Sequence, residues 1–250
     1  MMNVSLVVHR VGADTAKNIE QMDLAVTQSA KAGAHLVLFS EAATTGLILN
    51  HDPRHDLMLG EPVPGPAVTH FAELARSCRV HIAFGILERD GAALYDTAVL
   101  VGPSGDMLLK YRRIDPQWHD QVSDSKLYRE GTECAAVDSP IGRFSFAISD
   151  DLFNDTVAEQ VQEQHPTYLL MPFARCFDSG LCDQSRWEIE ERRTYLDRVQ
   201  KLGVTTLMTN SLGDKDFDGG TFGGAMVVHA NGRITHSLQL GMPGIIVAAI

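Results

Sequence analysis

Short apolar runs rich in β-branched residues alternate with amphipathic helical segments over the first third of the chain. The run from Val4 to His9 is typical of a strand, and in 16–31 the apolar residues recur at helical spacing. A second helical segment, 67–79, leads into another apolar run at 80–87. Strands that alternate with helices favour sheets whose outer faces are covered by helices. The pattern therefore predicts an α/β fold.

The rest of the chain adds hairpins to this pattern. The runs 95–101 and 107–112 flank the turn sequence GPSGD, and Asn231-Gly232 divides GGAMVVHANGRITHSL at a strong two-residue turn signal. The segment 187–202 is rich in charge and is expected to form one long helix.

Length and charge limit the classes of protein. A chain of 250 residues fits one large domain, 1–250, better than two small ones. The net charge of −11 argues against nucleic acid and anionic membranes as partners. No apolar run is long enough to cross a bilayer, and MMNVSLVVHR lacks the basic region of a secretory signal. The four cysteines show no metal or CxxC spacing, which favours reduced thiols in a cytoplasm.

Polar residues follow three of the expected strands, at the point where each strand ends. They are Ser40-Glu41, Arg112-Arg113 and Ser149-Asp150-Asp151. In α/β folds the chemistry usually lies in loops at strand ends, so these three places are the candidate site.

In this order the three strand ends resemble the nitrilase, or carbon–nitrogen hydrolase, family. LVLFSEAATTG matches its first motif and implies that Glu41 is the general base. In GDMLLKYRRI, Arg113 takes the place of the family's lysine, and in FAISDDL, Ser149 takes the place of its cysteine nucleophile. Asp151 matches the aspartate of the third motif, and Asp124 stands seven residues before Gly131, a spacing at which many members have a glutamate.

The resemblance covers nearly the whole chain and implies a four-layer αββα sandwich. It also implies a homodimer or higher homo-oligomer in which sheets continue across subunits. The expected activity is amidase-like hydrolysis of a non-peptide C–N bond in a small amide or nitrile, with no cofactor and no metal. Because its planar fork suits carboxylates, Arg113 also points to a carboxylate-bearing ligand.

The two catalytic substitutions leave three interpretations of Ser149 open. It is a working nucleophile in a modified hydrolase, the mark of a lost nucleophile in a catalytically silent small-molecule-binding or interaction protein, or a cysteine-to-serine change introduced into the chain. A serine hydroxyl is far less acidic than a thiol and needs a strong adjacent base. Glu41 alone is a poor base for it, and Arg113 cannot deprotonate to replace lysine.

Four more residues are candidates for binding a ligand near this site. Asp124, Asp150, Asp151 and Cys176 are candidate binding residues, although Asp151 also suits a local cap and Cys176 an inert thiol. We expect Arg113 to be paired with Glu41 or a neighbouring aspartate, Asp124 being the first choice after Glu41, because a lone buried charge is costly.

Two other groups have simpler interpretations. Lys110 is expected to point away from Arg113 into solvent. A metal-dependent hydrolase is the remotest alternative, since the His and Asp residues of HDPRHD at 51–56 lack a supporting motif.

Overall fold

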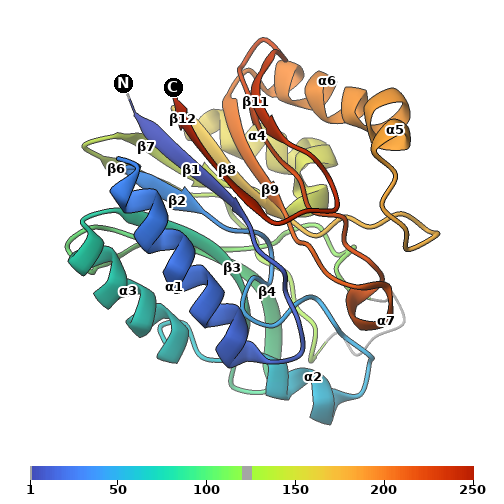
Figure 1. Ribbon diagram of the computed structural model, residues 1–250. Coiled ribbons are helices and arrows are strands. Elements are labelled where there is room, and N and C mark those ends of the chain that lie inside the picture. The colour runs from blue at the N-terminus through green and yellow to red at the C-terminus, as the bar shows by residue number, and fades with distance from the viewer. Residues whose placement is uncertain (1, 120–125) are drawn as a thin grey trace.

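The computed structural model describes residues 2–119 and 126–250 and consists of two stacked six-stranded sheets with helices on both outer sides (Figure 1). The first sheet has the order β12-β1-β2-β3-β4-β5 and the second β11-β10-β9-β8-β7-β6. The strands of the first sheet are β1 Asn3–Val8, β2 Leu36–Leu38, β3 His81–Asp90, β4 Ala93–Val101, β5 Met107–Arg112 and β12 Gly244–Ala249. Those of the second are β6 Ala136–Ser139, β7 Gly142–Phe146, β8 Tyr168–Phe173, β9 Thr205–Asn210, β10 Ala225–Val228 and β11 Ile234–Leu238.

Helices α1 (Thr15–Lys31) and α3 (Pro66–Cys78) cover the first sheet and make the parallel crossovers β1 to β2 and β2 to β3. The Asp14 side chain caps α1 by accepting a hydrogen bond from the Lys17 N–H, which satisfies one of the free donors of the first turn. The apolar face of the helix packs its buried Met22 and Val26 against the sheet. The predicted strand–helix alternation is therefore confirmed here.

Helices α4 (Asp155–Glu163) and α6 (Arg192–Leu202) cover the outer side of the second sheet (Figure 1). The single long helix expected over 187–202 is wrong in one respect. After the short α5 (Gln184–Arg186), the turn η2 (Trp187–Glu191) is π-helical, and the Arg192 N–H bonds to the carbonyl of Trp187 five residues back. Such turns insert one extra residue into a helix and are not visible in the hydrophobic period. Two short helices, α2 (Pro53–Leu59) and α7 (Lys215–Asp218), and the 3-10 turn η1 (Ser149–Phe153) complete the elements.

The main core lies between the two sheets. Apolar side chains from both inner faces meet there, among them Leu6 and Leu100 from the first sheet and Phe144, Leu170 and Leu207 from the second, all fully buried. This packing gives the layers α, β, β and α, so the predicted four-layer sandwich is confirmed. None of the helices in the described part of the chain is long and apolar enough to span a bilayer.

Both predicted hairpins are present. β4 and β5 pair antiparallel, and so do β10 and β11 on either side of Asn231-Gly232. The first of them matters for the site, because Arg113 follows directly after the last residue of β5.

Candidate active site

Glu41, Arg113 and Ser149 meet at the strand ends, as the order of the motifs predicts. The Ser149 hydroxyl donates a hydrogen bond to Oε2 of Glu41, and Arg113 Nη1 donates to Oε1 at 3.0 Å. Glu41 therefore lies between the hydroxyl and the cation and receives one donor on each oxygen. Glu41 and Arg113 both follow strands of the first sheet, and Ser149 follows a strand of the second.

The loop after β2 presents Glu41, and it does so by remaining attached to β3. Gly85 N–H bonds to the Ser40 carbonyl, and Ala43 N–H bonds to the Gly85 carbonyl. Ala42 adopts a left-handed φ of 43°, which turns the chain directly after Glu41. A Cβ on Gly85 would lie 2.5 Å from the Glu41 Cα, so only glycine allows β3 to approach this closely.

Arg113 is buried, with 2% of its side chain exposed, and lies among several carboxylates. Besides Glu41, its Nη2 bonds to Asp150 at 2.8 Å, and its Nη1 lies 3.6 Å from Asp96. Burial by itself lowers the pKa of Arg113, but the neighbouring carboxylates, Glu41 first, outweigh it and raise the pKa above its usual range. The guanidinium is thus a permanent cation, and the expected pairing with Glu41 is present.

Ser149 begins η1 with a φ of 47°, a left-handed conformation that non-glycine residues rarely adopt. This sharp turn at the end of β7 aims the hydroxyl at Glu41. The Ala174 backbone N–H, directly after β8, donates to the same oxygen at 3.1 Å. Strained residues of this kind concentrate at functional sites, because surrounding structure has to hold them.

Asp151 connects the segment that carries Ser149 to the segment that carries Arg113. Its carboxylate accepts hydrogen bonds from the backbone N–H groups of Ile148, Ile114 and Asp115 and from the Tyr111 hydroxyl. It therefore ties the turn that carries Ser149 to the segment that carries Arg113. Burial raises the pKa of Asp151 to about 6, although the backbone donors oppose the shift.

The four candidate binding residues have different positions. Asp150 contacts Arg113 and keeps 44% of its side chain exposed, whereas Asp151 is fully buried in the brace just described. Cys176 is half-buried, and its backbone forms a β-bridge with Thr221. Asp124, the expected second partner of Arg113, lies outside the described residues. A binding role for each of them stays a prediction.

Two groups next to the site belong to none of the three sequence motifs. Asp96, in the middle of β4, is 1% exposed and faces Glu41 and Arg113. Its signal was a lone acidic residue inside the apolar run LYDTAVLV. The Ala174 N–H is a backbone group and carries no signal in the side-chain pattern.

The two groups given simpler interpretations are both engaged in the structure. Lys110 does lie on the other face of the hairpin, but it is paired with Glu88 at 2.8 Å rather than solvated alone. In the histidine-rich loop, buried Asp56 accepts from His55, from Tyr128 and from the backbone N–H of His51. Its role there is to hold the loop, and no group of three metal-ligating side chains is found among residues 2–119 and 126–250.

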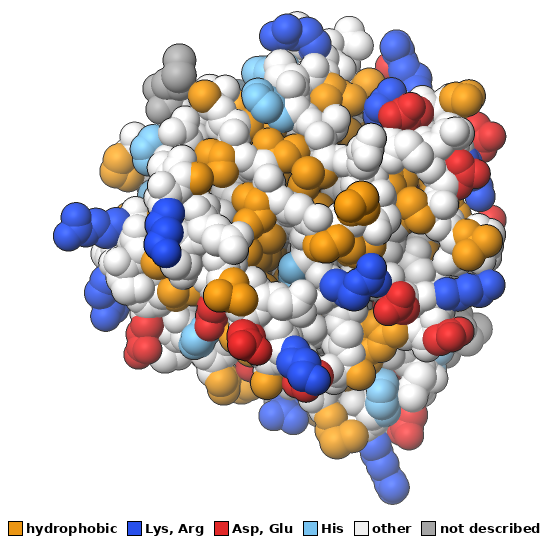
Figure 2. All heavy atoms as spheres, viewed as in Figure 1, with side chains coloured by type: hydrophobic (Ala, Val, Ile, Leu, Met, Phe, Trp, Pro, Cys, Tyr) orange, Lys and Arg blue, Asp and Glu red, His pale blue; other side chains and the backbone are white. Residues whose placement is uncertain are grey.

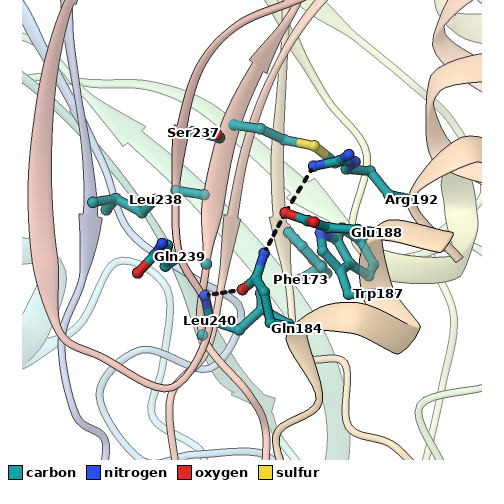
Figure 3. Close-up of a pocket in the computed structure, with 13 residues that line it drawn as sticks. Phe173, Gln184, Trp187, Glu188, Arg192, Ser237, Leu238, Gln239 and Leu240 are labelled. Atoms are coloured by element: carbon teal, nitrogen blue, oxygen red, sulfur yellow. Dashed lines mark hydrogen bonds and ion pairs between the residues drawn. The ribbon is translucent and has the colours of Figure 1, made fainter.

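A separate cleft of about 270 Å³ opens between the α5–η2 segment and strands β10 and β11 (Figure 3). Glu41, Arg113 and Ser149 do not line it. Three of its polar side chains are linked, since Gln184 accepts from the Leu240 N–H and donates to Glu188, which also pairs with Arg192.

Comparison with known proteins agrees with this fold and these motifs. The model of the carbon–nitrogen hydrolase family matches residues 4–250, and the chain belongs to that family. A formamidase of Bacillus cereus (strain B4264) is 36% identical over 108 residues, which are 42% of this chain and 32% of the formamidase. Nitrilase 3 of Arabidopsis thaliana is 31% identical over 150 residues, or 54% of this chain and 43% of the nitrilase. The matched region thus spans less than half the length of these curated relatives.

The fold is also that of solved amidases. The NitN amidase of Nesterenkonia sp. AN1 superposes with a TM-score of 0.82 at 18% identity, covering 100% of this chain and 93% of that one. A variant of that amidase was crystallised in complex with butyramide. The match confirms the two-sheet sandwich, because the whole chain takes part in it.

Proposed function

We propose that this protein is an amidase-like hydrolase of the carbon–nitrogen hydrolase family that cleaves the non-peptide C–N bond of a small amide or nitrile. The observation that carries the proposal is the hydrogen bond from the Ser149 hydroxyl to the Glu41 carboxylate, beside the Arg113 cation. A nucleophile within hydrogen-bond reach of a base that is itself oriented by a third group is the arrangement that nucleophilic catalysis requires. It favours the working-nucleophile interpretation of Ser149 over the silent one.

The chemistry follows from these positions. For an amide, the Ser149 oxygen attacks the carbonyl carbon while its proton passes to Glu41. Collapse of the tetrahedral intermediate breaks the C–N bond, and Glu41 returns the proton to the leaving nitrogen, so ammonia departs and an acyl ester remains on Ser149. Water, deprotonated by Glu41, then releases the carboxylic acid and restores the hydroxyl.

Arg113 and Ala174 supply the donors for the negative oxygen of the intermediate. The Ala174 N–H already points at the Ser149 oxygen, and the buried Arg113 Nε has no hydrogen-bond partner among the described residues. Donors held in place before the reaction need no reorganisation when the charge develops. Because Arg113 also withdraws charge from Glu41, we expect a weak base and slow turnover compared with a thiolate enzyme.

The direct test is the mass of the intact protein together with product release. Formamide, acetamide, butyramide, a small nitrile and an activated ester would be incubated with the wild type, with Ser149→Ala and with Glu41→Gln. The proposal requires product or an acyl adduct in the wild type and neither in Ser149→Ala. Ser104→Ala, at an exposed turn serine, is the matched control. A wild type that forms neither, yet is stabilised by the same compounds against heat, would establish the silent binding protein instead.

The remaining expectations are part of the same proposal. We propose one domain over residues 1–250, a homodimer or higher homo-oligomer, a cytoplasmic location, and catalysis without cofactor or metal. Amides of small acids are the first substrate class to test, because the amidase of the same fold was crystallised with butyramide. Arg113 extends this class to amides that also carry a carboxylate.

A further inference from the structure

The buried carboxyl of Asp96 has no donor, although it lies beside the site. Its two oxygens accept no hydrogen bond from any N–H or O–H group in the described part of the chain. The nearest cation, Nη1 of Arg113, is 3.6 Å from Oδ2, which is too long for a hydrogen bond. An ionised carboxylate in such a place would be buried and nearly unpaired, which is strongly unfavourable.

Glu41, next to it, is in the opposite situation. Each of its oxygens already accepts a donor, one from Ser149 and one from Arg113. Two donors therefore stabilise a charge on Glu41, whereas the oxygens of Asp96 have none among the described residues. The side chain of Asp96 faces Glu41, so a proton on Asp96 has an acceptor at hand.

We propose that Asp96 is protonated in the folded protein and donates that proton to Glu41 in a carboxyl–carboxylate hydrogen bond. The pair then carries one negative charge instead of two beside the single positive charge of Arg113. Asp96 acts as a positioning residue: it holds the Glu41 carboxylate in place and spares the buried cluster a second negative charge.

The other charged groups around the pair fit this assignment. Burial, and then the charge of Glu41, raise the pKa of Asp96 well above its usual range, while Arg113 opposes the shift. The titratable groups that surround Asp96, directly or through contacts with Arg113, are Glu41 from the loop after β2, Arg113 and Asp115 from the segment after β5, and Asp150 and Asp151 from η1. Four of these five are acidic, so a second ionised carboxylate would meet repulsion from several sides.

The dependence of stability on pH differs between a protonated and an ionised Asp96. If Asp96 is protonated when folded, unfolding releases its proton between the ordinary pKa near 3.9 and the raised pKa of the folded state. The raised group then stabilises the fold only at acid pH, and this contribution is lost as pH rises toward its folded pKa. The unfolding equilibrium constant of the wild type, relative to Asp96→Asn, rises by at most about tenfold per pH unit.

The experiment is urea unfolding of the wild type and Asp96→Asn at pH 5, 6, 7 and 8. Asparagine keeps the shape and a donor for Glu41 but cannot titrate. The proposal expects the ratio of the two unfolding constants, wild type over variant, to increase steadily with pH. A ratio that is flat or decreases shows an ionised Asp96 and overturns it. Asp155→Asn, whose exposed carboxylate pairs with Arg198 and Lys201, is the control and should give no such increase.

A spectroscopic measurement covers the case in which Asp96→Asn does not fold. The infrared band of a protonated carboxylic acid should persist in the wild type at pH 8, above the pKa near 6 of Asp151. It should shift when aspartate carboxyls are labelled with ¹³C. Absence of the band at pH 8 overturns the proposal.

The consequence for catalysis rests on the proposed function, whereas the unfolding and infrared measurements need no substrate. The wild type should lose kcat/KM at alkaline pH as the shared proton leaves, and that limb of the profile should be absent in Asp96→Asn. A merely structural role would lower the whole profile without changing its shape. Failure of the proposed function would show as no turnover at any pH, with the rising unfolding ratio intact.

Discussion

Arg113 binds two carboxylates with two different nitrogens, Glu41 through Nη1 and Asp150 through Nη2. A lysine ammonium is a single compact charge on one nitrogen and lacks the planar fork that reaches both positions. The arginine therefore fixes Glu41 and the turn that carries Ser149 at the same time. The two departures from the family pattern, at 113 and 149, are joined through these contacts, so their effects should not be independent.

We predict that Ser149→Cys alone gives little amidase activity and that Ser149→Cys with Arg113→Lys exceeds the product of the two single effects. A misplaced charge-stabilising donor costs on the order of 100-fold or more in rate, so a thiol beside an arginine remains handicapped. The measurement is kcat/KM on small amides for the wild type, both single variants and the double variant. Activity of Ser149→Cys equal to that of the double variant would show that Arg113 is a full substitute for lysine.

Gly85→Ala is expected to reduce turnover by about 100-fold, because catalysis is sensitive to displacements of about 1 Å. The new Cβ would lie 2.5 Å from the Glu41 Cα and 2.7 Å from the Ala42 nitrogen, so the loop has to move. Overpacking of this kind also costs about 1–3 kcal/mol of stability. Kinetics together with urea unfolding would test it, with Gly12→Ala as control, since a Cβ there meets nothing within 4 Å. Unchanged kcat/KM would mean that the Glu41 position is not critical.

At the level of elements, the β3–β4–β5 hairpins are joined by a buried cluster on the face that does not carry the site. Glu88 is 2% exposed and accepts from Lys110, Arg112 and Thr97. Burial raises the pKa of Glu88, but the donors outweigh it and lower the pKa below its ordinary value. This cluster links β5 to β3 across β4 and so fixes the position at which Arg113 leaves the strand.

Glu88→Gln should therefore lower the free energy of unfolding at pH 7 by about 1–3 kcal/mol, because a buried charge-assisted set of hydrogen bonds is lost. A carboxylate with a depressed pKa stabilises the fold above its unfolded pKa, and the contribution disappears as pH falls through the folded pKa. The difference between wild type and variant should accordingly shrink below about pH 4. Thermal unfolding from pH 3 to pH 8 measures it, with Asp138→Asn at the exposed pair to Arg143 as control.

Some features of the site are predictable from the amino-acid sequence, and others are not. The three strand ends were predictable because each apolar run stops abruptly at a polar group. Asp96 was not, because one acidic residue in a strand normally faces solvent, whereas in the fold this side chain is 1% exposed and lies beside Arg113. The left-handed turn at Ser149 and the Ala174 donor depend on backbone geometry, which side-chain patterns do not encode.

For the molecule as a whole, several large apolar side chains are exposed to solvent. Ile189 on η2 is 79% exposed, and Leu181 and Met242 are 64% and 63% exposed. Hydrophobic side chains also gather across the middle of the face that carries β11 and β12 (Figure 2). Exposed apolar surface of this kind favours association.

We predict that the 27.4 kDa chain is a dimer or higher oligomer in light scattering after size-exclusion chromatography, and that Leu181→Lys with Ile189→Lys shifts it toward the monomer. Charged side chains in an apolar contact are strongly unfavourable. Leu24→Lys is the matched control, because this residue is 58% exposed on α1, over the other sheet. An oligomer that survives the double change would place the interface elsewhere.

The site is divided between the two sheets: Glu41 and Arg113 follow strands of one, and Ser149 and Ala174 follow strands of the other. The rate of turnover therefore reports how well the two sheets are aligned with each other. A slip of one sheet over the other by less than the width of an atom would separate hydroxyl from carboxylate while every strand stayed hydrogen-bonded. In rising urea, catalytic activity should accordingly vanish at a lower concentration than the far-ultraviolet circular dichroism of the strands.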